Sequence, residues 1–534
     1  MSGGQRVNGE YNEKPLDIHV HDVNGKHATM TATPEELEVI EDAHNVHDVE
    51  MDDAEKNRLL RRIDLAIIPY AALLYLLSFL DRVNIGQAKL AGLMTDLKLT
   101  NNKYNIALTV FFVSYVAFEI PSNLALKVLH PRRWIAFIMI CWSICMTLMG
   151  TVKTSGQLIA VRFLLGLFEG GLFPGLNFLL TCFYTREEQG KRIAIFFAGA
   201  TLAGAFGGIL AFGIRHMAGI GGYNGWRWIF ILEGLLTFIC AIPAYWLVQD
   251  FPATSKILSR GNDRAKWLHH LTISQGVTNA EMPFAWKHVR RAFADWRTYV
   301  YALMYIGIAQ PFYSLSLFTP TIIAALGYKN AVANLLSTPP YVLGFITTLG
   351  TAYFSDRMRL RGPFIIFWMS VLIVGYIILI TQDKPSVSYF AIFLSVAGVS
   401  PCISTAIVWV GNNFGPITTR ATTMGVFFTM GNSAGIISSW VYPTTDSPRF
   451  FKGHGVAIGF AFMAIVCAII LMISNSRENA RRDRIYGPVA ADGNDNNPLR
   501  HDNKELMKRW GLEGMSRDEI LDLGDRHPGY RYIL

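Results

Sequence analysis

Two residues of opposite charge, Arg162 and Glu169, lie seven positions apart inside the apolar stretch RFLLGLFEGGLFPGLNFLL. Residues seven apart are separated by about two turns of an α-helix, so both side chains would project from one face. A charge at the centre of a bilayer costs several kcal/mol, and it is kept mainly where it faces a polar cavity or moves a charged species. The pair therefore indicates a transport site within a membrane-spanning helix.

The composition agrees with a chain that lies mostly in lipid. Hydrophobic residues make up 51% of the 534 residues and charged residues only 16%, whereas soluble domains carry about 25% charged residues. All six cysteines fall in apolar segments, so we expect small core residues and no extracellular disulfide framework. They are Cys141, Cys145, Cys182, Cys240, Cys402 and Cys467.

Apolar runs long enough to span a bilayer predict an all-α membrane protein with twelve transmembrane helices in two sets of six. The runs are 64–84, 104–127, 134–153, 157–180, 193–217, 227–248, 299–325, 334–354, 363–381, 388–411, 421–441 and 454–474. The predicted organisation is a tail at 1–57, a six-helix bundle at 58–248, a polar linker at 249–297, a second six-helix bundle at 298–476 and a tail at 477–534.

Lys and Arg cluster in every second connection between these runs. Such clusters remain on the cytoplasmic side of a membrane, so we expect both termini and the linker to be cytoplasmic. The formal net charge of +8 is then a consequence of topology. Nucleic-acid binding is a poor explanation of it.

The two tails add no clear site. Residues 1–56 are polar and acidic, without the basic start and apolar core of a signal peptide, and we expect them to be disordered. Scattered histidines there have no fixed spacing, so metal binding is a weak alternative and no metal site is predicted; they are His19, His21, His27, His44 and His47. No lipidation motif closes the second tail.

Six fragments, in order along residues 58 to 477, resemble the fungal allantoate permease family of the major facilitator superfamily. They are RRIDLAIIPYAALLYLLSFLDRVNIGQAKLAGL, VRFLLGLFEGGLFPGLNFLLTCFYTREEQGKRIAIFF, GWRWIFILEG, DFPAT, LGYKNAVANLLSTPPYV and TRATTMGVFFTMGNSAGIISSWVY. The resemblance implies an anion:cation symporter for small acids such as nicotinate, allantoate, pantothenate or biotin. It identifies the family and leaves the substrate open.

The resemblance also implies a site near the membrane midplane, lined by the first, fourth, seventh and tenth helices of two halves that rock against each other. The motifs DRVNIG and R-x-x-x-G-x-x-E are similar to those of proton-coupled organic-anion carriers. They imply proton coupling by Asp81 and Glu169 and substrate binding by Arg82 and Arg162. Amide and aromatic residues of the second half are the further candidates for substrate binding: Gln310, Tyr313, Trp409, Asn412 and Asn413.

The chemistry of anion import fits these residue types. The planar guanidinium of Arg binds both oxygens of a carboxylate and stays charged when buried. Coupling to protons needs a carboxyl group whose protonation and substrate binding influence each other. Asp81 beside Arg82, and Glu169 near Arg162, meet this requirement.

Structural interpretations compete with these roles. Arg162 and Glu169 could serve helix packing alone, and Asp81 and Arg82, near a predicted helix end, could anchor the helix at the interface. Glu119, beside Pro121, is a gate or a helix-break partner, and Glu233 is interpreted as structural. The run AYFSDRMRLR resembles the cytoplasmic motif of the superfamily, in which an Asp locks one conformation, so Asp356 and Arg357 are gating candidates.

The sequence thus predicts a monomeric, multi-pass transporter of the plasma membrane whose partners are a small organic anion, a proton and the lipid bilayer. No cofactor is expected. A proton-independent facilitator or effluxer and a non-transporting nutrient sensor are the alternatives. A membrane-embedded enzyme is the weakest, because no Ser-His pair, HExxH motif or paired-Cys site occurs at membrane depth.

Overall fold

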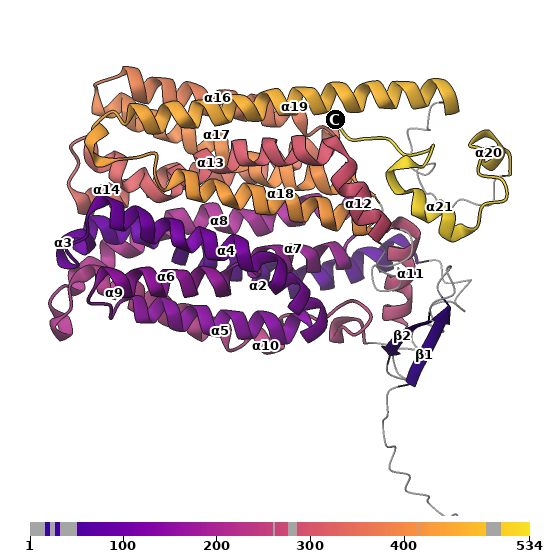
Figure 1. Ribbon diagram of the computed structural model, residues 1–534, viewed down its shortest axis with the longest axis horizontal. Coiled ribbons are helices and arrows are strands. Elements are labelled where there is room, and N and C mark those ends of the chain that lie inside the picture. The colour runs from indigo at the N-terminus through magenta and orange to yellow at the C-terminus, as the bar shows by residue number, and fades with distance from the viewer. Residues whose placement is uncertain are drawn as a thin grey trace, which may run out of the picture.

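The computed structural model describes residues 16–21, 27–32, 51–259, 262–275, 286–415, 417–487 and 504–534. Long helices form most of this part of the chain and run side by side (Figure 1). The indigo and magenta helices of the first half lie beside the orange helices of the second.

Every predicted apolar run falls on a helix or on two helices in succession. In the first half these are α2 (Asp53–Ala88), α4 (Asn101–Leu129), α5 (Pro131–Met149), α6 (Ser155–Glu169) with α7 (Leu172–Phe183), α8 (Arg186–Ile214), and α9 (Gly225–Ala241) with α10 (Ala244–Leu247). In the second half they are α13 (Trp296–Ala325), α15 (Thr338–Met358), α16 (Gly362–Thr381), α17 (Pro385–Asn413), α18 (Ile417–Ser438) and α19 (Phe451–Tyr486). Within the described residues, 10 spans are long and apolar enough to cross a membrane. The predicted all-α membrane fold is confirmed.

Shorter elements connect these helices. They are η1 (Lys89–Leu93), α3 (Met94–Asp96), η2 (Arg215–Met217), η3 (Ile220–Gly222), η4 (Lys256–Leu258), α11 (Asp263–Gln275), α12 (Trp286–Ala294), α14 (Asn330–Leu336), η5 (Thr444–Asp446), α20 (Lys504–Arg509), α21 (Arg517–Leu523) and η7 (Gly524–Arg526). The elements α11, α12, α20 and α21 gather at one end of the long helices, which we call the linker end (Figure 1).

Local sequence explains how several helices begin and break. The Thr154 hydroxyl accepts a hydrogen bond from the backbone N–H of Gln157 at 3.3 Å, which caps α6. Pro131 and Pro385 occupy the first turn of α5 and α17, where no backbone donor is needed. The fourth predicted run is divided into α6 and α7 at Gly170 and Gly171.

The two halves meet along α8 with α15, α4 with α18, and α2 with α13. Glycine permits these close approaches. A Cβ on Gly86 of α2 would lie 2.5 Å from the Leu317 carbonyl oxygen of α13, and one on Gly435 of α18 would lie 2.2 Å from the Phe112 ring of α4. The two halves are therefore in close contact along these helix pairs.

The amino-terminal segment contains regular structure that the sequence analysis did not anticipate. Strands β1 (Leu16–His21) and β2 (His27–Ala32) pair antiparallel, with Leu16 opposite Ala32 and His21 opposite His27. The alternation in LDIHVH and the β-branched residues of HATMTA favour strands. His44 and His47 lie outside the described residues.

Candidate functional site

A buried ion pair between the first and fourth spans forms the centre of the site. The Arg82 Nη2 of α2 lies 2.6 Å from the Glu169 Oε1 of α6, and the Arg82 Nε lies 3.1 Å from the same oxygen. Ser78, one turn before Arg82, donates a third hydrogen bond to Oε1 at 2.7 Å. Arg82 is 3% exposed and Glu169 is 0% exposed. A carboxylate held this way keeps the guanidinium in place within the protein interior.

Hydrogen bonds continue from this pair into the second half. The Arg82 Nη1 donates to the Tyr313 hydroxyl of α13 at 3.2 Å, and Tyr313 donates to the Asn432 Oδ1 of α18 at 2.8 Å. The Asn432 amide then donates back to the Glu119 Oε2 of α4, in the first half, at 3.1 Å. The network therefore crosses the boundary between the halves twice.

A small cavity between the halves opens onto this network. Its lining is mainly aromatic, and the Arg82 guanidinium, the Asn432 amide and the tyrosine hydroxyls are the polar groups that could orient a ligand. The lining residues are Tyr75, Arg82, Tyr115, Phe173, Phe197, Tyr305, Ala309, Phe312, Tyr313, Ile403 and Asn432. The Arg82 guanidinium lies 4.7 Å from the centre of the Tyr115 ring and 5.6 Å from that of Phe79. These rings stabilise the cation without neutralising it.

Asp81 and Arg82 lie inside the bundle, which contradicts the interfacial interpretation of this pair. Helix α2 continues past them to Ala88, and Asp81 is 0% exposed. Asp81 accepts hydrogen bonds from the Trp142 indole at 2.8 Å and from the Thr237 hydroxyl at 3.0 Å. It therefore packs against α5 and α9, whereas its neighbour Arg82 faces the cavity.

Arg162 and Glu169 share a helix face but form no ion pair in the described part of the chain. Arg162 is 1% exposed, and its Nε and Nη2 have no hydrogen-bond partner there. Its guanidinium lies 5.9 Å from the centre of the Phe111 ring. The structure assigns Arg82 as the partner of Glu169 and leaves Arg162 as a buried cation beside the site.

Of the residues predicted in the second half, only Tyr313 lines the cavity. Gln310 is buried on the same helix and donates to Ser314 at 3.0 Å. Trp409 and Asn413 donate to the Ile533 carbonyl oxygen, each at 2.8 Å, and Asn412 accepts from the Tyr530 hydroxyl through its backbone oxygen. These three residues of α17 therefore hold the end of the chain at the linker end, because α17 extends beyond the cavity.

The gating candidates Asp356 and Arg357 form no ion pair with each other in the described part of the chain. Asp356 forms an ion pair with Arg361, while the exposed Arg357 donates to Tyr353 at 3.4 Å. A Cβ on Gly190 of α8 would lie 2.5 Å from the Asp356 Oδ1, so this carboxylate rests against the first half. The candidate contact between the halves at the linker end thus uses Arg361 in place of Arg357.

Several residues of the cavity lining and of the surroundings of Arg82 were not predicted to bind substrate, although the sequence contains a signal for some of them. Phe111, Tyr115 and Glu119 follow one another at intervals of four on α4, which places them on one helical face. Tyr75, Phe79 and Arg82 share a face of α2 in the same way. Tyr305 had no such signal, because its role depends on the partner half.

Comparisons with known proteins cover both halves of this fold. A sequence model described as Major Facilitator Superfamily matches residues 71–439. An uncharacterized transporter of Schizosaccharomyces pombe is 36% identical over 441 residues, which are 82% of this chain and 88% of the relative. The high-affinity nicotinic acid transporter of Saccharomyces cerevisiae is 30% identical over 434 residues, 80% of each protein.

Solved structures show the same architecture. The proton:xylose symporter XylE is similar with a TM-score of 0.57 at 14% sequence identity, over 76% of this chain and 95% of the symporter. At this identity the likeness concerns the fold alone. The chemistry of the site must come from the residues of this chain.

Proposed function

The chain belongs to the major facilitator superfamily of membrane transporters, and we propose that it is a proton-coupled importer of a small organic anion. The observation that carries this proposal is the Arg82–Glu169 ion pair, buried at a cavity between the two halves. A buried guanidinium whose carboxylate partner can be protonated is able to take an anionic substrate as its counter-ion.

The pair supplies a way to link proton and anion. Protonation of Glu169 removes the negative charge that neutralises Arg82, and a substrate carboxylate then replaces it as the counter-ion. The Glu169 Oε2 has no hydrogen-bond partner among the described residues, so one oxygen is available to take the proton. Each ligand thereby favours the binding of the other.

The lining of the cavity and a relative both support a flat carboxylate as the substrate. Aromatic rings from Tyr75, Tyr115 and Phe312 offer stacking surfaces near the single cavity-lining guanidinium. One relative is a nicotinic acid transporter, which carries a small heteroaromatic acid. We therefore place nicotinate-like acids first among the substrates, with allantoate-type acids next.

The network through Tyr313 and Asn432 transmits substrate binding to the second half. When a carboxylate takes the place of Glu169, Arg82 shifts, and its bond to Tyr313 must adjust. Because Asn432 bridges Tyr313 and Glu119, the contact of α18 with α4 is affected as well. This gives alternating access a local trigger.

We further propose that the transporter lies in the plasma membrane with its linker end on the cytoplasmic side. We also propose that it acts as a monomer. The basic connections gather on that side of the spans.

The substrate class is tested by expressing the chain in yeast deleted for its own permeases and measuring growth and uptake on nicotinate, allantoate, pantothenate and biotin. Failure on every acid tested, with normal surface expression, would exclude this substrate class.

Uptake is expected to be driven by protons, because the titratable group, Glu169, and the cationic group, Arg82, share one site. Acidifying the medium should stimulate uptake, and a protonophore should abolish accumulation. The measurement is initial uptake of labelled substrate at several external pH values. If the protonophore does not change uptake and the internal substrate concentration never exceeds the external concentration, the protein is a facilitator.

Asn432→Ala is expected to lower substrate affinity about 5- to 150-fold, because the Tyr313 hydroxyl and the Glu119 carboxylate lose a shared partner, at about 1–3 kcal/mol. Ser433→Ala is the matched control, since among the residues that the structure describes this hydroxyl donates only to the Met430 carbonyl oxygen of its own helix, at 2.6 Å. Equal affinity in the two variants would remove the network from the binding mechanism.

A further inference from the structure

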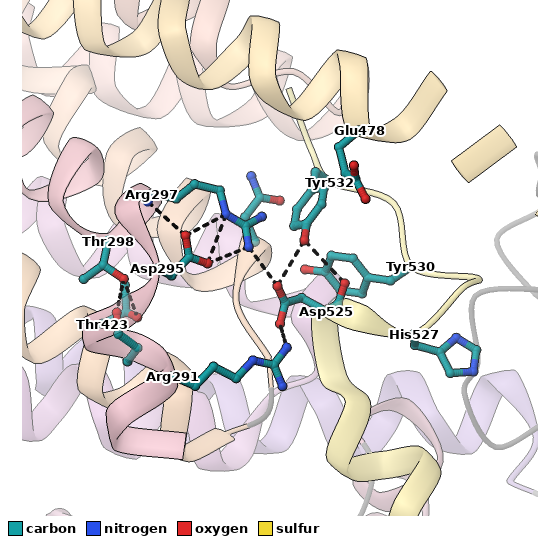
Figure 2. A network of polar contacts seen from close by, with 12 residues as sticks. Arg291, Asp295, Arg297, Thr298, Thr423, Glu478, Asp525, His527, Tyr530 and Tyr532 are labelled. Carbon is teal, nitrogen blue, oxygen red and sulfur yellow. Dashed lines mark hydrogen bonds and ion pairs between the residues drawn. The ribbon is translucent and has the colours of Figure 1, made fainter. Parts of the chain in front are cut away.

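The linker end of the second half holds residues 525–534 of the chain, which we call the C-terminal segment. Figure 2 shows Asp525, Tyr530 and Tyr532 of this segment beside Arg291, Arg297 and Glu478. The surface beneath it is built by α12 and by the adjacent ends of α13, α17 and α19. None of the residues that line the central cavity belongs to this segment, so the cavity by itself assigns the segment no role in transport.

Two asparagine side chains bind the backbone of the segment on both sides. The Asn479 amide of α19 donates to the Tyr532 carbonyl oxygen at 2.8 Å and accepts from the Tyr532 N–H at 2.9 Å. The Asn413 amide of α17 does the same with Ile533, at 2.8 Å for both bonds. Successive residues of an extended chain point their backbone groups to opposite sides, and each side meets one amide. This is recognition of an extended peptide by its main chain.

A buried acidic side chain fixes the register of the segment. Asp525 is 2% exposed and accepts from the Arg291 Nη2 at 2.5 Å and from the Arg297 Nη2 at 3.1 Å. The Tyr532 hydroxyl donates to the Asp525 Oδ2 at 3.0 Å. Burial raises the pKa of this hydroxyl, so it remains protonated and can donate. Two arginines of the surface thus bind the Asp525 carboxylate, and Tyr532 of the segment itself adds a third donor.

Arg482 of α19 completes the surface. It is 6% exposed, and its Nη1 donates to the carbonyl oxygens of Asp525 at 2.9 Å and of Tyr530 at 3.0 Å. The adjacent Arg481 is exposed and pairs only with Glu478 among the described residues. Of these two neighbouring arginines, Arg482 therefore binds the segment and Arg481 does not contact it in the described part of the chain.

Polar contacts dominate this docking, while Ile533 packs half-buried against the main hydrophobic core and the His527 ring lies 5.0 Å from that of Trp510. Trp510, Leu512 and Ile520 form a small hydrophobic cluster of their own, separate from the main core. A segment held mainly by hydrogen bonds and ion pairs can leave its surface without opening a hydrophobic core.

We propose that this surface of α12, α13, α17 and α19 is a peptide-binding groove whose occupant is the C-terminal segment of the same chain, bound reversibly. The Leu534 carbonyl oxygen accepts from the Arg361 N–H at 2.5 Å, and the side chain of Arg361 pairs with Asp356, which rests against α8. Occupancy of the groove therefore stabilises the contact between the halves at the linker end. This inference does not depend on the substrate.

The first test measures hydrogen exchange of residues 529–534 in the full-length protein reconstituted in lipid. The wild-type segment should exchange slowly, and Arg482→Ala or the double variant Asn413→Ala with Asn479→Ala should exchange about tenfold faster or more. Arg481→Ala is the matched control and should exchange like wild type. Free exchange in the wild type, or no change in either groove variant, overturns the proposal.

A second measurement leaves the groove intact. A fluorescent peptide with the sequence of residues 525–534 is added to full-length protein carrying Asp525→Asn, whose own segment is weakened. The peptide should bind saturably, and a peptide with Asn in place of the aspartate should bind about tenfold more weakly. Absence of saturable binding, or equal binding of the two peptides, contradicts the groove.

Discussion

Arg82→Gln is expected to reduce substrate affinity by about 2–5 kcal/mol, which is roughly 30- to 4,000-fold. The loss is large because the variant removes the only guanidinium among the residues that line the cavity. It also leaves Glu169 buried without its cationic partner. Lys in place of Arg should rescue only in part, because an ammonium cannot reproduce the two bonds from Nε and Nη2 to Oε1.

The measurement is the concentration dependence of uptake, with surface expression measured in parallel. Arg357→Gln is a suitable control, because the substitution removes the same charge. Among the described residues, this exposed arginine donates only to Tyr353. Arg162→Gln makes a second comparison, since Arg162 is buried but does not line the cavity. Normal affinity in Arg82→Gln and a loss in Arg162→Gln would transfer the anion site to Arg162.

Glu169→Gln is expected to abolish accumulation while leaving exchange of substrate across the membrane. The amide resembles the protonated acid in shape, and its oxygen can still accept from Ser78 and Arg82. A side chain that cannot release a proton contributes no free-energy difference between the protonated and deprotonated states. The accumulation ratio should therefore fall to about one, since coupling is lost.

Counterflow and net uptake are measured on the same vesicles under an imposed pH gradient. Ser78→Ala serves as a comparison, because it removes one hydrogen bond from an uncharged donor to Glu169 and keeps the titratable group. Accumulation that still follows the pH gradient in Glu169→Gln would assign proton coupling to another carboxyl group. Asp81 is the next candidate, and Glu119 follows because Asn432 connects it to the site.

The membrane fold could be predicted from sequence because it depends on local composition. Helix formation in lipid follows from the length and hydropathy of each run, since every backbone group must bond within its own segment. The twelve predicted runs accordingly match the observed helices. The interruption at Gly170 and Gly171 was missed, because a two-residue break hardly changes the mean hydropathy of the run.

The charged residues of the candidate site could also be named from sequence, because a charge inside a predicted membrane span is conspicuous by its cost. Arg82 and Glu169 were both identified as functional candidates. Their partnership was not, because Arg162 is the nearer cation along the chain. The rotation of α2 against α6 brings Arg82, 87 residues away, to 2.6 Å from Glu169.

The amides and aromatic residues of the second half show where local reasoning ends. Neutral polar side chains carry no comparable cost, so their presence on a predicted cavity helix does not reveal the depth at which they lie. Tyr313 meets Arg82 in the cavity, whereas Trp409 and Asn413 bind the C-terminal segment beyond it. Sequence by itself determined which segments enter the membrane and which charges are exceptional. Only the packing of the two halves decided which side chains meet, because partners from distant helices are brought together by the rotation and depth of each helix.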